Sequence, residues 1–159
     1  MDQDQSLREH LKKLLNWEDA HVNYDSAVEG IDEAVRGVVP EGFQHSPWQL
    51  IEHLRITQHD ILDFCINPAY TERAFPRDYW PASAEPASTS AWDESVASFR
   101  RDRKKLQELA ANSKINLFER IPYGNGQTYL REILLVADHN AYHVGQLVAV
   151  RRALGVWPT

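Results

Sequence analysis

The sequence predicts an all-α protein built from four long helices. Apolar residues recur at steps of three and four along four separate stretches, as they do on the buried face of a helix. No stretch alternates apolar and polar residues in the way that a half-buried strand does. The chain has 159 residues, of which 43% are hydrophobic and 25% are charged. This is the size of one globular domain, so we expect a single domain over residues 1–159.

Charge and apolar runs exclude several classes of protein. The longest apolar run, Ile133–Ala137, has five residues, whereas a membrane helix needs roughly 20. A formal net charge of −6 argues against a nucleic-acid partner. The acidic, polar start of the chain is unlike a secretory or transit signal. We therefore expect a cytoplasmic protein that binds neither a membrane nor nucleic acid.

The first two helices carry different signals. The first runs from about residue 6 to residue 35, with a break indicated near Asn16, and its apolar stripe contains one histidine, His21. The second covers about residues 46–66. An N-cap serine, a proline at the first helical position and a glutamine that completes a capping box mark its start: Ser46, Pro47 and Gln49.

A connection of about 20 residues, from residue 69 to residue 89, separates the second helix from the third, which covers about residues 90–111. Loops of this length usually cover a site or pack as extended chain. Two of its aromatic residues, Tyr79 and Trp80, favour packing and are expected to form a wall of any pocket on this side.

The fourth helix begins at the cap Thr128, reaches Leu154 and stops at Gly155. It is apolar nearly all the way round. One side carries Leu130, Leu134, Ala137, Ala141, Val144 and Val148, and the other carries Leu135, Val136, Leu147, Val150 and Leu154. A helix of this kind is buried on more than one face. We therefore expect a homodimer that packs through this helix.

Three histidines form a candidate metal site. His139 and His143 are four residues apart, so their side chains lie one turn apart on one face and can share a metal ion. The alternative is a pair of hydrogen-bonded core or interface histidines. His53, at the border of the apolar stripe of the second helix, adds a third ligand. Three histidines with open positions are typical of a catalytic metal site, whereas structural sites are closed.

Four further residues are candidates for lining a pocket at this site: His21, Trp48, Asp60 and Tyr142. Asp60, seven residues after His53, is either a carboxylate that supports a ligand or a surface charge. His21 either lines the pocket, serves as a fourth ligand or is a core histidine. No group stands out as the general base, although His21, Asp60 and Tyr142 are candidates for that role. The remaining histidines, His10, His45 and His59, receive no role.

Two segments resemble the signature segments of the DinB-like superfamily of metal-binding helical proteins: residues 46–54, SPWQLIEHL, and residues 138–147, DHNAYHVGQL. Residues 78–81, 126–128 and 151–158 also fit that family. The resemblance extends over about residues 6–158. It implies a four-helix bundle, commonly dimeric, with a long connection between its second and third helices.

The resemblance also implies a divalent metal ion held by His53, His139 and His143. Zinc or nickel is the first expectation, with iron or manganese as alternatives, because histidine ligands suit several of these ions. Characterised relatives include transferases and isomerases that use a low-molecular-weight thiol. The first hypothesis is thus a metal-dependent enzyme with a small-molecule substrate, a thiol-dependent S-transferase or a related hydrolase. The alternative is a non-catalytic metal-binding stress-response protein.

Overall fold

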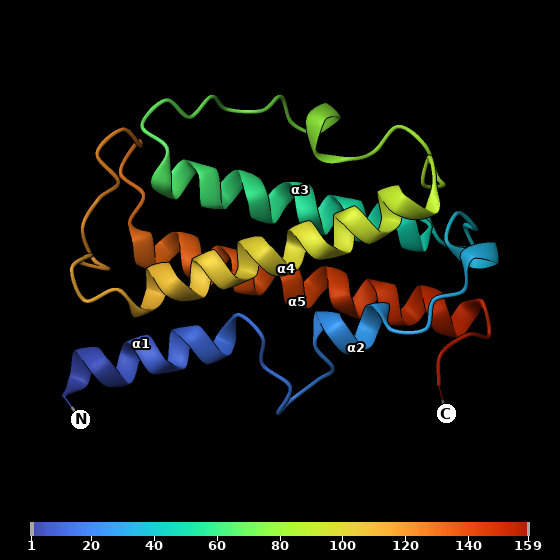
Figure 1. The fold of residues 1–159 in the computed structure, drawn as a ribbon, viewed down its shortest axis with the longest axis horizontal. Helices are drawn as coiled ribbons and strands as arrows, with labels where there is room; N and C mark the ends of the chain where they lie inside the picture. Colours follow the sequence, from blue (N-terminus) through green and yellow to red (C-terminus); the bar gives the residue numbers. More distant parts are fainter. Residues whose placement is uncertain (1, 159) are drawn as a thin grey trace.

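The computed structural model describes residues 2–158 as a bundle of four long helices (Figure 1). These are α1 (Gln3–Leu14), α3 (Pro47–Ile66), α4 (Thr89–Ala111) and α5 (Tyr129–Ala153). Three shorter helices lie in the connections: α2 (Tyr24–Val28), η1 (Glu33–Val35) and η2 (Arg77–Tyr79). The described residues contain no strand. The all-α prediction, with a long connection between the second and third long helices, is confirmed.

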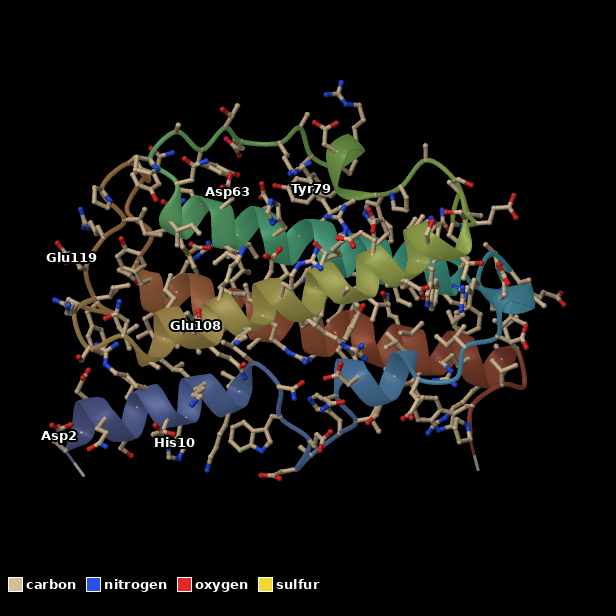
Figure 2. All side chains as sticks on the ribbon, viewed as in Figure 1. Asp2, His10, Asp63, Tyr79, Glu108 and Glu119 are labelled. Carbon is tan, nitrogen blue, oxygen red and sulfur yellow. The ribbon has the colours of Figure 1, made fainter. Side chains whose placement is uncertain are left out.

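The long connection follows from the directions of the helices. Figure 1 shows α3 and α4 running the same way, whereas α5 runs the opposite way. Two parallel neighbours require a connection that returns along the helix, and a 20-residue helix is about 30 Å long. Residues 67–88 make this return over the outer side of α3, and Figure 2 shows Tyr79 lying there.

The predicted start of the second long helix is confirmed in atomic detail. The Ser46 hydroxyl accepts a hydrogen bond from the Gln49 backbone N–H at 3.2 Å, and the Gln49 side chain accepts one from the Ser46 N–H at 3.1 Å. Pro47 is the first residue of α3. Thr128 likewise caps α5, and Gly155, at φ +71°, follows its end. These local signals fix where the helices that carry the candidate ligands begin and end.

The prediction of one helix over residues 6–35 is wrong beyond the indicated break. The first long helix ends at Leu14, and only the short elements α2 and η1 follow before residue 36. The side chains of Asn23 and Asp32 cap these two short elements by accepting backbone N–H groups. Such side chains offer the backbone an alternative to a continuous helix. Gly30, at φ +68°, provides the turn between the two elements.

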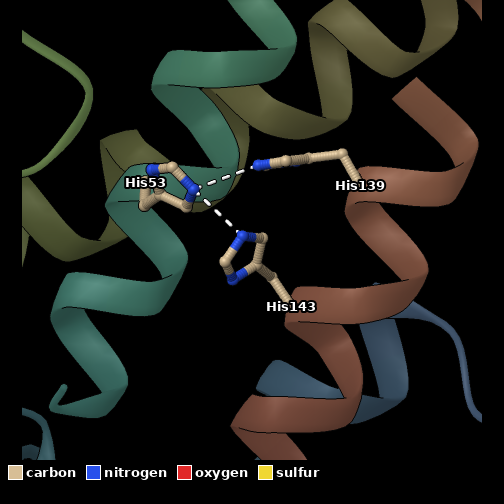
Figure 3. A group of neighbouring side chains, drawn as sticks. All are labelled: His53, His139 and His143. Atoms are coloured by element: carbon tan, nitrogen blue, oxygen red, sulfur yellow. Dashed lines mark hydrogen bonds between the residues drawn. The ribbon is translucent and has the colours of Figure 1, made fainter. Parts of the chain in front are cut away.

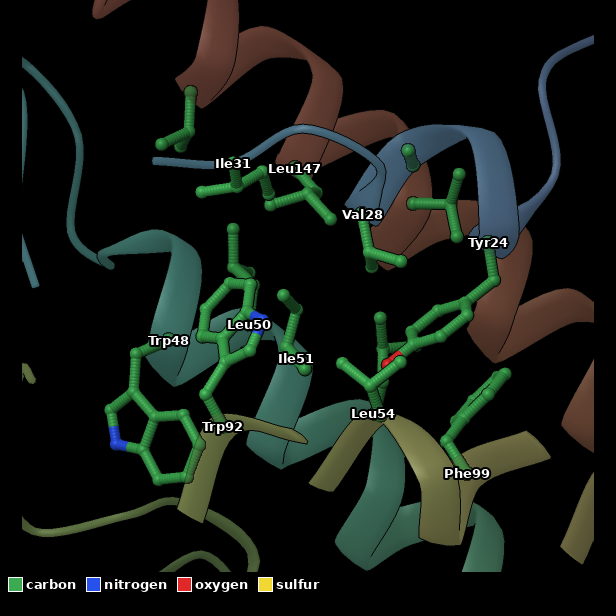
Figure 4. Packing of buried hydrophobic residues seen from close by; sticks show 14 residues of the cluster. Tyr24, Val28, Ile31, Trp48, Leu50, Ile51, Leu54, Trp92, Phe99 and Leu147 are labelled. Carbon is green, nitrogen blue, oxygen red and sulfur yellow. The ribbon is translucent and has the colours of Figure 1, made fainter. Parts of the chain in front are cut away.

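Two apolar cores fill the bundle. We call the first the α2 core, and Figure 4 shows its packing. Its larger members are Tyr24, Trp48, Leu50, Ile51, Leu54, Trp92, Phe99, Val144 and Leu147. We call the second the α1 core, with Leu11, Leu15, Ile61, Leu62, Leu106, Leu109, Ile133 and Val136 among its members. Along each of α3, α4 and α5 the two cores occupy opposite ends.

Polar side chains, all of them buried except the half-buried His139, separate these cores. We call this set the polar layer: His53, Thr57, Gln58, Asp60, Asp102, His139, Asn140 and His143. Its members come from the middle of α3, α4 and α5. The centre of the bundle is therefore polar, and Arg8, Glu132 and Arg151 are among the buried polar residues outside this layer. No helix among the described residues is long and apolar enough to cross a membrane.

The last helix is buried on its inner side and partly exposed on its outer side. Val136, Leu147 and Val150 are buried in the cores of this chain. The outer side of α5 exposes Leu134, at 44%, and Tyr142, at 63%. An interface with a second copy would therefore use the outer side, because the inner side is already filled.

Candidate metal centre

The fold brings His53, His139 and His143 together between α3 and α5 (Figure 3). The Nε2 atom of His53 lies 3.1 Å from Nε2 of His143 and 3.0 Å from Nε2 of His139. One ring nitrogen from each of the three lies within 4.8 Å of the others. Because α3 and α5 run in opposite directions side by side, residues 90 positions apart in sequence meet at one point.

The orientation of His53 is fixed from two sides. Its Nδ1 donates a hydrogen bond to the backbone carbonyl oxygen of Tyr79 at 2.8 Å. Trp80 stacks on the imidazole with ring centroids 3.8 Å apart and planes inclined by 2°. A carbonyl oxygen can only accept, so the proton of the neutral ring is on Nδ1 and the lone pair of Nε2 faces the other histidines.

Tyr79 is itself held in place by Asp60. The Tyr79 hydroxyl donates to the Asp60 carboxylate at 2.7 Å, the Tyr70 hydroxyl donates at 3.2 Å, and Arg73 lies 3.4 Å from it. Asp60 is on α3, two turns after His53. The carboxylate thus anchors the long connection on α3, and the connection then presents the Tyr79 carbonyl to His53.

The other two histidines, His139 and His143, differ in whether their Nδ1 atoms have a hydrogen-bond partner. Nδ1 of His143 donates to the Gln146 side-chain oxygen at 2.7 Å, and the Gln146 amide in turn donates to the Tyr142 hydroxyl at 3.2 Å. Nδ1 of His139 is buried and has no hydrogen-bond partner among the described residues. Second partners of this kind set which ring nitrogen carries the proton and which can bind a metal ion.

Burial keeps all three rings neutral near pH 7. Desolvation lowers the pKa of His53 to about 4, with a smaller contribution from His143 and against the hydrogen bond to Tyr79. Desolvation, followed by the charges of His143 and His53, lowers the pKa of His139 to about 3, and the neighbouring Asn140 side chain acts in the opposite direction. Desolvation also lowers the pKa of His143, against its bond to Gln146. Neutral imidazole is the form that binds a metal ion.

The residues present fit a divalent metal ion. The bonds to Tyr79 and Gln146 place the protons of His53 and His143 on Nδ1, so two bare Nε2 atoms face each other at 3.1 Å. Two lone pairs at this separation repel unless a metal ion or a shared proton lies between them. Among the described residues no other histidine, cysteine or carboxylate joins the group, so an ion held here would keep open positions, as in catalytic sites.

A cavity of about 650 Å³ opens from the three histidines. Its walls include six aromatic side chains: Phe64, Tyr70, Phe75, Tyr79, Trp80 and Tyr123. Two buried carboxylates also line it, Asp60 on α3 and Glu132 on α5, the latter paired with Arg131 at 2.7 Å. This volume is within the range of pockets that hold small molecules.

The structure places the four candidate pocket residues differently. Asp60 lines the cavity and supports His53 through Tyr79 without touching it. Tyr142 lies edge-on to His143, with centroids 4.9 Å apart, on the exposed side of α5. Trp48 is buried in the α2 core. His21 is exposed and lies at a separate cavity of about 250 Å³ between α5 and the segment after α1.

Sequence reasoning gave no role to two side chains that contact the site. Gln146 follows His143 by three residues. Side chains at this spacing meet on a helix, so the sequence did contain the signal for this contact. His45 stacks on the face of Trp80 with centroids 4.0 Å apart, and His53 also stacks on Trp80. Nothing in the sequence around His45 indicates this contact, because it depends on where the long connection lies.

The bundle and the three converging histidines define a class of metal-binding helical proteins. Residues 16–147 match the profile of the DinB superfamily, and the chain belongs to that superfamily. The matched segment contains all three histidines. Comparison with curated proteins and with solved structures gives no match. The family and the cluster together fit a metal-binding DinB-like protein.

Proposed function

We propose that the protein is a metal-dependent enzyme that acts on a small molecule, with a thiol or water as the attacking group. The observation that carries this proposal is the convergence of three neutral imidazoles at one end of an open cavity of about 650 Å³. A site that only stabilises the fold needs no cavity, and closed tetrahedral sites serve that purpose.

The proposed roles follow from the positions of the residues. His53, His139 and His143 hold the ion, zinc or nickel in the first instance and iron or manganese as alternatives. A divalent ion held there supplies Lewis acidity toward a thiol or water, which favours the ionised nucleophile near neutral pH. Trp80 excludes water from one face of His53 by stacking on it. The aromatic walls provide the surface for an apolar substrate.

A thiol-dependent transfer is the finer form of the proposal. Many low-molecular-weight thiols carry carboxylates, and Arg131 lines the cavity. Arg131 is paired with Glu132, and its side chain remains 55% exposed. Arg131 is thus a cation that the carboxylates of such a cofactor would meet in the cavity. The related hydrolase uses water in place of the thiol and needs no cation there.

Metal content and turnover test the proposal. We expect about one equivalent of metal in the untagged protein and its loss in a folded His139→Ala/His143→Ala variant. A His10→Ala/His21→Ala variant removes two exposed histidines and should retain the metal. Loaded protein should then turn over an aromatic electrophile with a thiol, or hydrolyse it. Absence of metal after reconstitution contradicts the proposal at its first step.

One observation favours a second candidate, a non-catalytic metal-binding protein of a stress response. Both buried carboxylates of the cavity are engaged: Asp60 by two tyrosines and Glu132 by Arg131. Neither is left free as a general base in this arrangement. Full metal occupancy without turnover of any thiol and electrophile pair supports this candidate.

We also propose that a second copy packs on the outer side of α5. Leu134, Ala141 and Tyr142 lie exposed on that side, next to the helix face that carries the histidines. A pair formed there would bring two metal centres onto opposite sides of one interface.

A further inference from the structure

The outer support of the metal centre is incomplete at one of its three histidines. A histidine that binds a metal ion through Nε2 carries a proton on Nδ1, and this N–H ordinarily donates to a nearby acceptor. Tyr79 and Gln146 provide that acceptor for His53 and His143. The Nδ1 atom of His139 is buried without a partner among the described residues. A buried N–H group without an acceptor destabilises the fold.

An unpaired acceptor lies in the next residue. The side-chain oxygen of Asn140 is also buried and without a partner among the described residues. The Asn140 residue is only 9% exposed. An orphaned acceptor next to an orphaned nitrogen that needs one indicates that the two belong together. This pairing is independent of the two bonds already described.

The orientation of the Asn140 amide is fixed from the far side of the bundle. The backbone carbonyl of Phe99 on α4 can only accept, so Gln58 turns its NH₂ group toward it, at 2.8 Å. The oxygen of Gln58 then faces α5 and accepts from the NH₂ group of Asn140 at 3.0 Å. Reversing either amide would place oxygen against oxygen. The only group of Asn140 that remains for His139 is therefore its oxygen, an acceptor.

We infer that Asn140 is the positioning residue of His139: its side-chain oxygen accepts the Nδ1–H of His139 and thereby leaves Nε2 free for a metal ion. The direction of these hydrogen bonds is set by the backbone carbonyl of Phe99 on α4. Gln58 on α3 and Asn140 on α5 pass it on to the candidate ligand His139. The Asn140 oxygen thus favours the Nδ1–H form of His139 in the metal-free protein over the Nε2–H form, in which Nε2 would donate to Nε2 of His53 at 3.0 Å. This inference rests on the proposed metal centre only for its consequence, metal affinity.

The test reads the tautomer of His139 without metal. Long-range ¹H–¹⁵N NMR spectra of the metal-free protein at pH 7 distinguish a proton on Nδ1 from one on Nε2. We expect Nδ1–H in the natural sequence and a mixture, or Nε2–H, in Asn140→Leu. The affinity for Zn²⁺, measured against a competing chelator, should fall about 10- to 100-fold in the same variant.

Two further variants separate positioning from packing. Asn140→Asp retains an acceptor oxygen and loses the donor to Gln58, so we expect Nδ1–H and Zn²⁺ affinity to persist while thermal stability falls. It also keeps the test decisive if Asn140→Leu does not fold. Gln146→Leu is the matched control, because it removes the partner of His143 and should leave the tautomer of His139 unchanged.

The results that overturn the inference are distinct from those that overturn the proposed function. An unchanged His139 tautomer in Asn140→Leu rejects the inference, as does loss of Nδ1–H in a folded Asn140→Asp. If Zn²⁺ does not bind to the natural sequence, the proposed function fails, and the tautomer still decides the role of Asn140.

Discussion

The two apolar cores and the polar layer between them differ in the chemistry of the side chains that they bury. In the cores, side chains such as Phe99 and Leu54 are at most 1% exposed and pack against other apolar groups. In the polar layer, buried side chains and the half-buried His139 carry ring nitrogens, amides and carboxylates. The cores stabilise the helices at both ends of the bundle. They thereby hold the polar layer in an arrangement that the layer could not maintain by itself.

The two regions differ in how many polar groups they bury. The hydroxyl of Thr57 is buried in the polar layer without a partner among the described residues, and so is the hydroxyl of Tyr24 in the α2 core. Each such group costs free energy when buried. The polar layer carries many more polar groups than the cores, so its stability depends on the hydrogen bonds that join its side chains across α3, α4 and α5.

The largest expected effect comes from damage to a core. Phe99→Ala should lower the free energy of unfolding by about 3–5 kcal/mol, because it removes a fully buried ring and leaves a cavity. Denaturant titration followed by circular dichroism measures this loss. Phe118→Ala, at a side chain that is 65% exposed, is the control and should change stability by less than about 0.5 kcal/mol. Similar losses in both variants would contradict the assignment of the core.

Lowering the pH should reduce the free energy of unfolding through the histidines of the polar layer. In the unfolded chain histidine takes up its proton near pH 6.5, whereas burial holds the pKa of His53 at about 4 in the fold. Between these values the unfolded state binds more protons. The free energy of unfolding of metal-free protein should therefore fall as the pH falls below about 6.5, by up to about 1.4 kcal/mol per pH unit for this histidine.

The pKa of His139, held at about 3, gives a contribution of the same sign. Urea titrations between pH 7 and pH 5 with a chelator present measure the slope. A folded His139→Gln variant should have a shallower slope, since one of the depressed groups is gone. An identical slope would show that this histidine is not protected from protonation.

Deletion of a polar atom from the layer should have the opposite sign to deletion of apolar atoms from a core. Thr57→Val replaces the unpaired, buried hydroxyl with a methyl group of similar size, so stability should rise by about 1 kcal/mol. Thr57→Ser keeps the hydroxyl and loses a methyl group, and it should be destabilised. Thermal unfolding of the three proteins measures both shifts. A loss of stability in Thr57→Val would indicate that the hydroxyl is paired in solution.

The smallest effect on stability is expected outside both regions, on the outer side of α5. Leu134→Lys should change the free energy of unfolding by less than about 0.5 kcal/mol, because the side chain is 44% exposed. If a second copy packs there, the same variant shifts the mass in solution from dimer to monomer, which light scattering detects. Val136→Lys is the contrasting variant, since Val136 is fully buried and the change should unfold the chain.

Much of this arrangement was predictable from sequence because its signals are local. Helix periodicity and caps placed α3, α4 and α5 to within a few residues, and the spacing of His139 and His143 put both on one face. The first helix was predicted too long, because side-chain caps at Asn23 and Asp32 compete with a weak helical pattern. The sequence indicated that Asp60 is either a supporting carboxylate or a surface charge. It did not indicate that Asp60 supports His53 through Tyr79, which was expected only as a pocket wall.

The sequence by itself determined the helical class, the boundaries of α3, α4 and α5 to within a few residues, and the family signature that contains the three histidines. Only the tertiary structure decided that His53 meets the other two, that the Tyr79 carbonyl and Trp80 hold it, and that Gln58 links Phe99 to Asn140. The physical reason is separation along the chain. Caps and periodicity depend on neighbours within one or two turns, whereas these contacts join residues 26 to 90 positions apart, and packing of both cores sets where they fall.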